Sequence, residues 1–173
     1  MRSRWRRFLR FQGATSGTAA ILVAVSAENV EVVRRTVAAL DRALDAYWSD
    51  PRSIARAYRD GDLWPEWEEW LAHLHPETEW KTIFLGDTLH GHEGCVLVWN
   101  DFLRGADNYR FTLETVDDVG EDRVYSEVSI TMQGKDGRPS LATRVYQVIT
   151  IRDGKIGRLE EYTTREEALA AVG

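Results

Sequence analysis

The sequence predicts an α+β fold, in which helices pack against a curved sheet of antiparallel or mixed strands. Upstream of His75, apolar residues recur every three or four positions, as on one face of a helix. Downstream, several runs alternate apolar and polar residues, as half-buried strands do. Two of these runs are joined by Asp153-Gly154, a strong signal for a two-residue hairpin turn. Helices followed by a run of antiparallel strands are typical of the α+β class.

The composition is that of an ordinary globular domain. The chain has 173 residues, of which 43% are hydrophobic and 29% charged, so it fits one domain with a sizeable core. A net charge of −6 disfavours nucleic acid as a partner. The one cysteine, Cys95, excludes an intrachain disulfide, and no apolar run reaches the ~20 residues of a membrane span. We therefore expect a cytoplasmic protein with neither nucleic acid nor a membrane as a partner.

The first 25 residues differ in character from the rest. They begin with a basic stretch and end with a short apolar run, Ala19 to Val25, an order that resembles an export signal. Arg6 and Arg7 loosely resemble a twin-arginine motif. The apolar run is short, however, which favours an upstream extension before the folded part. We expect residues 1–25 to be an extension and residues 26–173 to be the domain, and export remains open if residues 1–27 are a signal.

Three helices are predicted in the first part of the domain. The first is Glu28 to Trp48, with Ser26 as its N-cap, and its apolar positions are Val30, Val33, Val37, Leu40, Leu44 and Tyr47. A short helix follows at Arg52 to Arg59. The third runs from Asp62 to His75, with Pro65 in its first turn. Its apolar stripe, which comprises Trp67, Trp70, Leu71 and Leu74, is predicted to pack in the core, and some of these side chains could also wall a pocket.

Strands dominate the second part. The predicted elements are a strand at Thr78–Leu85, a loop at Gly86–Gly91, a helix at His92–Leu103, and strands at Tyr109–Val116 and Arg123–Gln133. The capping box Thr164 to Glu167 opens a last short helix. Glu127 lies on a polar face of its strand, so we expect it to face solvent.

The hairpin Leu141 to Thr163 organises the prediction of the site. If Asp153-Gly154 forms the whole loop, Tyr146 lies opposite Glu161 and Val148 lies opposite Leu159. Because side chains alternate along a strand, these four residues then share one face with Arg144.

The order of these elements and several short phrases resemble the nuclear transport factor 2-like superfamily, specifically its SnoaL-like, polyketide cyclase-like branch. The resemblance covers Ser26 to Gly173, and Ala46 to Tyr58 resembles an insertion. The phrases are Asn29 to Arg34, Gly61 to Leu63, Leu74 to Trp80, Gly91 to Gly94, Arg152 to Ile156, Glu161-Tyr162, and Arg165 to Leu169.

This resemblance implies a cone-shaped, cystatin-like α+β barrel whose helices and sheet surround a mostly apolar cavity. Members are commonly dimers, so a homodimer is expected. The superfamily includes ketosteroid isomerases, polyketide cyclases, epoxide hydrolases and members with no known reaction, so function has to be argued from the pocket residues.

Glu161 is the leading candidate for a catalytic residue. In epoxide hydrolase-like members, an acidic residue just before the aromatic residue of the last strand works in acid–base catalysis, and Glu161 precedes Tyr162 in this way. The Arg-x-Asp pattern of those members is not visible in this sequence. A carboxyl among apolar side chains loses hydration, which raises its pKa and suits it to proton transfer near neutral pH. Tyr146 is the candidate polariser of a carbonyl group and Arg144 a neighbour that would keep Glu161 ionised, although the three could instead form a structural cluster at a dimer face.

Further residues are predicted to bind the substrate. They are Arg144, Trp67, Trp70, Trp80, Trp99, His90, Leu159 and Val148. His90 and His92 lack a third ligand at useful spacing, so we expect no metal. Proton transfer beside a carbonyl group requires no cofactor.

The sequence therefore predicts a pocket protein for a small apolar molecule. Its leading function is that of a cyclase or isomerase that acts on an apolar carbonyl compound by acid–base chemistry. One alternative is a non-catalytic binding or dimerisation module for an apolar ligand, and another is an epoxide-type hydrolase.

Overall fold

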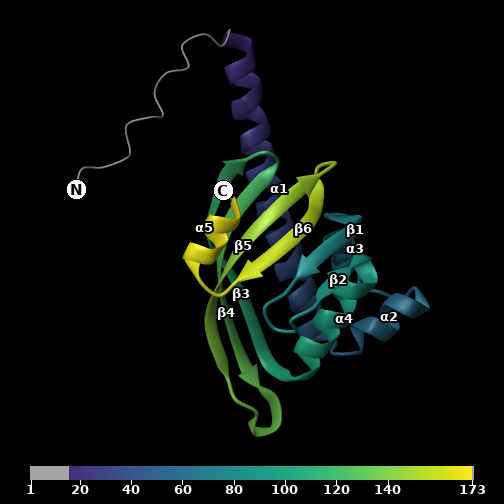
Figure 1. Cartoon of the computed structure of the whole chain (residues 1–173). Helices are drawn as coiled ribbons and strands as arrows, with labels where there is room; N and C mark the ends of the chain where they lie inside the picture. The colour runs from purple at the N-terminus through teal and green to yellow at the C-terminus, as the bar shows by residue number, and fades with distance from the viewer. Residues whose placement is uncertain (1–15, 173) are drawn as a thin grey trace, which may run out of the picture.

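The computed structural model describes residues 16–172, with side chains from residue 27 onward. Within this part of the chain, six strands form one curved sheet in the order β2-β1-β6-β5-β4-β3 (Figure 1). All neighbouring strands are antiparallel except β1 and β6, which are parallel. The sheet is open, with β2 and β3 at its edges, and the predicted α+β class is confirmed. The strands are β1 (Leu74–Lys81), β2 (Thr88–His90), β3 (Ala106–Gly120), β4 (Arg123–Gly134), β5 (Leu141–Arg152) and β6 (Lys155–Tyr162).

Helices lie on both faces of the sheet. Four of them, α1 to α4, pack together on the inner face, whereas α5 alone covers part of the outer face (Figure 1). None of the helices in residues 16–172 is long and apolar enough to cross a membrane. The helices are α1 (Ser16–Ser49), α2 (Ile54–Asp60), α3 (Pro65–Ala72), α4 (Gly91–Arg104) and α5 (Arg165–Val172), and a 3₁₀ turn, η1, spans Lys135–Gly137.

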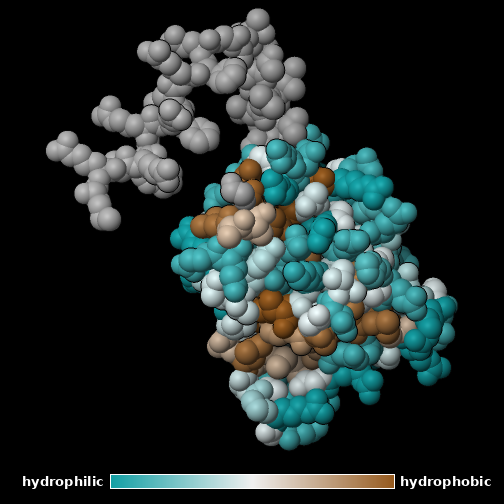
Figure 2. Space-filling model, in the orientation of Figure 1, coloured by the Kyte–Doolittle hydropathy of each residue, from teal (hydrophilic) through white to brown (hydrophobic). Residues whose placement is uncertain are grey.

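The main hydrophobic core lies between α1–α4 and the inner face of the sheet. A second, smaller cluster of Tyr125, Val148 and Ala168 lies under α5. The surface shown in Figure 2 is mostly hydrophilic, with apolar side chains gathered in small patches. Most apolar side chains are therefore used inside the fold, on one side of the sheet.

Helix α1 is longer than predicted. It runs continuously through Ser26, so the prediction of Ser26 as an N-cap is wrong. The predicted apolar face is correct, since Val33, Leu40, Leu44 and Tyr47 are all buried. The predicted extension, residues 1–25, lies outside the described residues apart from the helical backbone of residues 16–25.

Strand β1 begins earlier than predicted, at Leu74 rather than Thr78, and α3 ends at Ala72 rather than His75. The pairing of β1 with β6 is irregular between Leu74 and Glu79, a place where a proline such as Pro76 is tolerated in a strand. The chain leaves the sheet after Lys81, and the backbone N–H of Ile83 donates a hydrogen bond to the side chain of Glu161 in β6. The predicted loop at residues 86–91 contains the short strand β2.

The last hairpin forms, but its predicted register is wrong. Asp153 and Gly154 both have positive φ, 52° and 70°, as a type I′ turn requires, and Ile151 pairs with Ile156 as expected. Gly157 is then an extra residue in β6, so Thr150 pairs with Arg158 instead of with Gly157. A Cβ atom at position 157 would lie 2.8 Å from Cβ of Arg152, so glycine fits this bulge.

Because of the bulge, the residues of β5 that lie opposite Glu161 and Leu159 differ from the predicted ones. Glu161 lies opposite Gln147 and Leu159 lies opposite Ile149, whereas Tyr146 lies opposite Tyr162. The predicted pairs of Tyr146 with Glu161 and of Val148 with Leu159 are therefore wrong. A shift of one residue moves a side chain to the other face of a sheet, which separates Tyr146 from Glu161.

Candidate functional site

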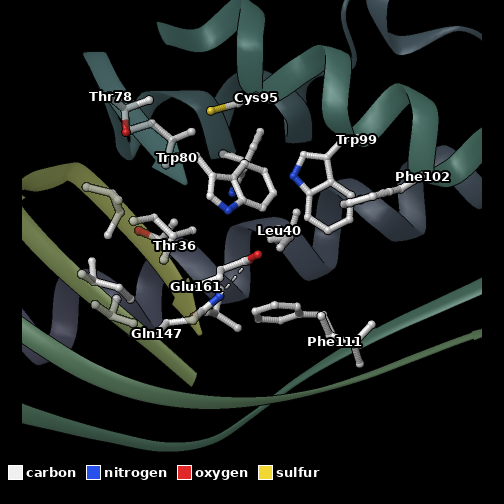
Figure 3. Close-up of a pocket in the computed structure, with 18 of the residues that line it drawn as sticks. Thr36, Leu40, Thr78, Trp80, Cys95, Trp99, Phe102, Phe111, Gln147 and Glu161 are labelled. Atoms are coloured by element: carbon white, nitrogen blue, oxygen red, sulfur yellow. Dashed lines mark hydrogen bonds between the residues drawn. The ribbon is translucent and has the colours of Figure 1, made fainter. Parts of the chain in front are cut away.

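A pocket of about 80 Å³ lies between the inner face of the sheet and helices α1, α3 and α4 (Figure 3). Its walls are mainly aromatic and aliphatic, and none of the described residues that line it is Lys, Arg or His. Glu161 is the one carboxyl among them. The aromatic residues are Trp70, Trp80, Phe84, Trp99, Phe102, Tyr109 and Phe111, and the polar ones are Thr36, Thr78, Gln147 and Glu161.

The local periodicity of each helix and strand explains why these side chains point into the pocket. Cys95 and Trp99 are four residues apart in α4 and therefore share the helix face that looks into the pocket. Thr78 and Trp80 alternate in β1, and Leu159 and Glu161 alternate in β6 beyond the bulge. The pocket is thus built where an inward helix face meets the inward residues of two parallel strands.

A row of polar groups crosses the sheet at the base of the pocket. Ser126 of β4 pairs with Gln147 of β5, which pairs with Glu161 of β6. Ser126 Oγ donates to Gln147 Oε1 at 2.9 Å, and Gln147 Nε2 donates to Glu161 Oε1 at 3.5 Å (Figure 3). The N–H of Ile83 donates to Glu161 Oε2 at 3.2 Å. The row fixes the orientation of the carboxyl, which projects into the aromatic space.

The environment of Glu161 favours its protonated form. Only 5% of Glu161 is exposed, and burial raises the pKa of its carboxyl above the ordinary value. Nearby donors, from Thr82, the Ile83 N–H, Trp80 and Gln147, act in the opposite direction and lower the pKa. No Lys, Arg or His of the described residues forms an ion pair with this carboxyl. A carboxyl with a raised pKa can exchange a proton closer to neutral pH than an ordinary one.

Aromatic rings pack tightly around the carboxyl. The ring centroids of Trp80 and Trp99 are 6.1 Å apart, and those of Trp99 and Tyr109 are 5.2 Å apart. Burial, together with the charge of Glu161, raises the pKa of the Tyr109 hydroxyl, which therefore stays protonated. The indole N–H groups of Trp80 and Trp99 are buried and have no hydrogen-bond partner among the described residues. The Trp80 N–H lies near enough to Glu161 to lower the pKa of its carboxyl. It nevertheless makes no well-formed hydrogen bond with that carboxyl.

Five of the residues predicted to form the site line the pocket. They are Glu161, Trp70, Trp80, Trp99 and Leu159.

The other predicted site residues lie elsewhere. Trp67 is fully buried in the core, where its ring contacts those of Trp70 and Trp99. His90 is exposed at the end of β2, with Nδ1 3.9 Å from Glu79 Oε1. Tyr146, Val148 and Arg144 lie on the outer face of the sheet, because the bulge at Gly157 leaves them out of phase with Glu161.

The prediction that Glu127 faces solvent is wrong, because α5 covers its strand. It is 8% exposed and accepts a hydrogen bond from the Tyr125 hydroxyl at 2.8 Å. Arg144 and Arg165 approach it at 3.7 and 3.5 Å. Since Arg165 is the first residue of α5, this outer cluster attaches the last helix to the sheet.

Gln147 and Tyr109 are pocket residues that sequence reasoning did not single out. The missing signal for Gln147 was Gly157, since an isolated glycine inside a strand pattern indicates a bulge. Once that bulge is recognised, Gln147 replaces Tyr146 as the neighbour of Glu161. Tyr109 alternates correctly with the inward residue Phe111 in β3, but nothing in the sequence brings that strand near Glu161.

The fold defines a protein of the nuclear transport factor 2-like class. The family model of the SnoaL-like domain matches residues 51–159, which is well over half of the chain. The chain therefore belongs to the SnoaL-like domain family. None of the curated proteins matches it in sequence.

Solved structures with low sequence identity share this fold. An NTF2-like protein of unknown function from Burkholderia pseudomallei is 16% identical, with a TM-score of 0.53 over 84% of this chain and 97% of that chain. TerC, co-crystallised with polyporic acid, is 19% identical, with a TM-score of 0.52 over 84% and 98%. An LEH-like epoxide hydrolase from M. tuberculosis is 12% identical, with a TM-score of 0.51 over 85% and 90%. At these identities the likeness is one of fold.

Proposed function

We propose that the protein binds a small, predominantly apolar carbonyl compound in the pocket, and that Glu161 transfers a proton on it in a reaction of the cyclase or isomerase type. One observation carries this proposal: the carboxyl of Glu161 is buried among aromatic side chains, without a cation, and its pKa is raised. TerC and the epoxide hydrolase give general support, since proteins with this fold take an organic ligand and catalyse a reaction.

The chemistry requires a base and a hydrogen-bond donor. The ionised carboxylate of Glu161 removes a proton from the carbon beside the carbonyl group, and the electron pair of that C–H bond moves toward the carbonyl oxygen to form an enolate. Return of the proton to another carbon gives an isomer. Attack of the enolate carbon on a second carbonyl group of the molecule instead forms a ring and breaks the π bond of that group, and the resulting alkoxide takes the proton back from Glu161. Neither outcome changes the oxidation state of the whole molecule. The donor belongs inside the pocket and not at Tyr146, which lies on the other face of the sheet.

Ligand binding without catalysis is the second candidate. It is favoured by the lining of the pocket, in which no described residue other than Glu161 has a carboxyl, imidazole or amine group. The same observation argues against the epoxide-type alternative, because neither an arginine nor a second acid among the described residues is placed to activate water beside Glu161.

Exchange of carbonyl α-hydrogens with deuterated water tests the catalytic proposal. We expect the wild-type protein to accelerate exchange in small ketones, measured by proton NMR, and Glu161→Gln to lose about 10²-fold or more of that rate. Glu127→Gln is the matched control, because it makes the same change in a buried glutamate outside the pocket. Ketone binding with no exchange above the buffer rate would remove the enzyme proposal and leave a ligand-binding protein.

We also propose that the protein is a homodimer, in line with the family resemblance. Light scattering coupled to gel filtration measures this directly, and a mass of one chain at micromolar concentration would contradict it.

A further inference from the structure

Buried indole N–H groups without acceptors are a recurrent feature of this molecule. In the part of the chain that the structure describes, five tryptophans carry such a group, and Trp80 and Trp99 are the two of them that line the pocket. A buried donor without an acceptor costs free energy, since it has lost its hydrogen bond to water. An indole that faces a pocket, unlike one enclosed in the core, can regain that hydrogen bond from a ligand. The other three are Trp48, Trp64 and Trp67.

Trp80 and Trp99 are neighbours in the wall of the pocket. Their ring centroids are 6.1 Å apart with an interplanar angle of 43°, and both rings stand over the carboxyl of Glu161 (Figure 3). Trp80 is 7% exposed and Trp99 is 2% exposed, so water does not reach these donors freely. The rings belong to different elements, β1 and α4, whose mutual packing fixes their separation.

The chemistry of an indole restricts what it can bind. Its N–H group donates and has no acceptor capacity, so the complementary ligand atom is an acceptor. The absence of Lys, Arg and His among the described lining residues disfavours an anionic acceptor, whose charge would be buried without compensation. A carbonyl oxygen is neutral and has two lone pairs, which match two donors.

We propose that the indole N–H groups of Trp80 and Trp99 bind the carbonyl oxygen of a small uncharged ligand and thereby make the pocket select ketones over hydrocarbons of the same shape. This assignment rests on the proposed function for the carbonyl group of the ligand, but it does not require turnover. Glu161 and Phe111 lie across from the two indole rings (Figure 3), so a carbonyl group bound at the indoles would present its neighbouring carbons to Glu161. The hydroxyl of Tyr109 lies in the same pocket and is the competing donor.

The size of the pocket limits the ligand. At about 80 Å³ it is smaller than the ~150 Å³ cavity that accommodates benzene in another protein. Acetone, with four non-hydrogen atoms against the six of benzene, is therefore a suitable probe. Isobutene is its control, since it replaces the carbonyl oxygen by a CH₂ group with almost the same shape. Acetone is also regenerated by α-hydrogen exchange, so it persists even if the protein is active.

Nuclear magnetic resonance of the indole groups tests the proposal in the full-length wild-type protein. The chain has seven tryptophans, and their indole N–H signals are assigned with single Trp→Phe variants. We expect acetone to move the Trp80 and Trp99 indole proton signals downfield, as a new hydrogen bond does, and isobutene to cause no such downfield change. Equal shifts with both probes, or no binding of either probe, would overturn the proposal.

Affinity measurements with variants give a second test. Trp80→Phe and Trp99→Phe should each weaken acetone binding by about 3- to 10-fold, the effect of one neutral hydrogen bond, and leave isobutene binding nearly unchanged. Trp64→Phe is the matched control, because it removes another orphan indole N–H, from a ring that does not line the pocket and packs on Tyr47. Selectivity that is lost in Tyr109→Phe and kept in both indole variants would assign the donor to Tyr109 instead. If the indole shifts occur and no α-hydrogen exchange is found, the proposed enzyme function fails and the carbonyl-binding site stands.

Discussion

Two buried glutamates occupy opposite faces of the same sheet and have opposite surroundings. Glu127, on the outer face, has the hydroxyl of Tyr125 and the guanidinium groups of Arg144 and Arg165 beside it. Glu161, on the inner face, is equally buried but has only neutral donors and aromatic rings around it. Burial of a carboxyl therefore does not by itself indicate a functional site. The difference lies in the charge partner: among the residues whose side chains are described, Glu127 has two arginines beside it and Glu161 has no cation.

The sharpest test of this comparison is Glu161→Gln, for which the effects on activity and on stability should separate. If Glu161 is the base, proton exchange falls by about 10²- to 10⁴-fold. The free energy of unfolding at neutral pH should not fall, because a neutral amide avoids the desolvation that burial imposes on the carboxylate. Urea denaturation measures the stability, and a loss of more than about 2 kcal/mol would mean that Glu161 is mainly structural.

The bulge at Gly157 keeps the two glutamates in different surroundings, so Gly157→Val is the next test. The added side chain meets Cβ of Arg152, and we expect a loss of about 1–3 kcal/mol in the free energy of unfolding. Cross-strand nuclear Overhauser contacts show whether Gln147 still lies opposite Glu161. A variant that keeps full stability with Gln147 still opposite Glu161 would show that the register does not depend on glycine.

Glu127→Gln should have a smaller effect on stability. Its two arginine partners have side chains that are 52% and 61% exposed, so solvent screens much of the attraction, and we expect a loss of about 1 kcal/mol. Hydrogen exchange of the α5 amides should quicken, because Arg165 joins that helix to Glu127. Unchanged protection of α5 would contradict the structural role of the outer cluster.

The pH dependence of stability should distinguish Glu161 from every other carboxyl. Because its pKa is raised in the folded protein, the folded state keeps a proton that the unfolded state releases above pH ~4.3. The contribution of Glu161 is thus fully present at low pH and is lost as pH rises through the pKa of the folded state. The stability of wild type relative to Glu161→Gln should fall over this window by at most ~1.4 kcal/mol per pH unit. A difference that stays flat from pH 4 to 8 would show that its pKa is not raised.

The sequence predicted the layout of the fold better than the faces of its last hairpin. The α+β order, the helix at residues 91–104 and the buried side of α1 follow from local periodicity, which one chain segment carries by itself. The neighbours of Glu161 depend on the register between two strands, and Gly157 changes that register without changing the alternating pattern before it. For this reason the sequence pattern predicts Tyr146 in the pocket, where the structure has Gln147.

Local sequence patterns also do not predict which residues of distant strands lie near a pocket residue. Tyr109 and Ser126 reach the vicinity of Glu161 only because β3, β4 and β5 lie in order beside β6. No spacing within the chain encodes that order. The burial of Glu127 has the same origin, since α5 returns over the sheet from the end of the chain.

The single extra residue at Gly157 has a consequence for how such proteins diverge. The hairpin carries two complete sets of side chains: one with Gln147, Ile149 and Glu161, and the other with Tyr146, Val148 and Tyr162. Loss or gain of one residue near the turn would change which residues of β6 lie on the same face as each set of β5 residues. A new combination of acid, amide and phenol in the pocket could therefore arise by one codon deletion, without any substitution. Alignments of related chains that misplace a gap by one position in this hairpin would compare interior residues with exterior ones.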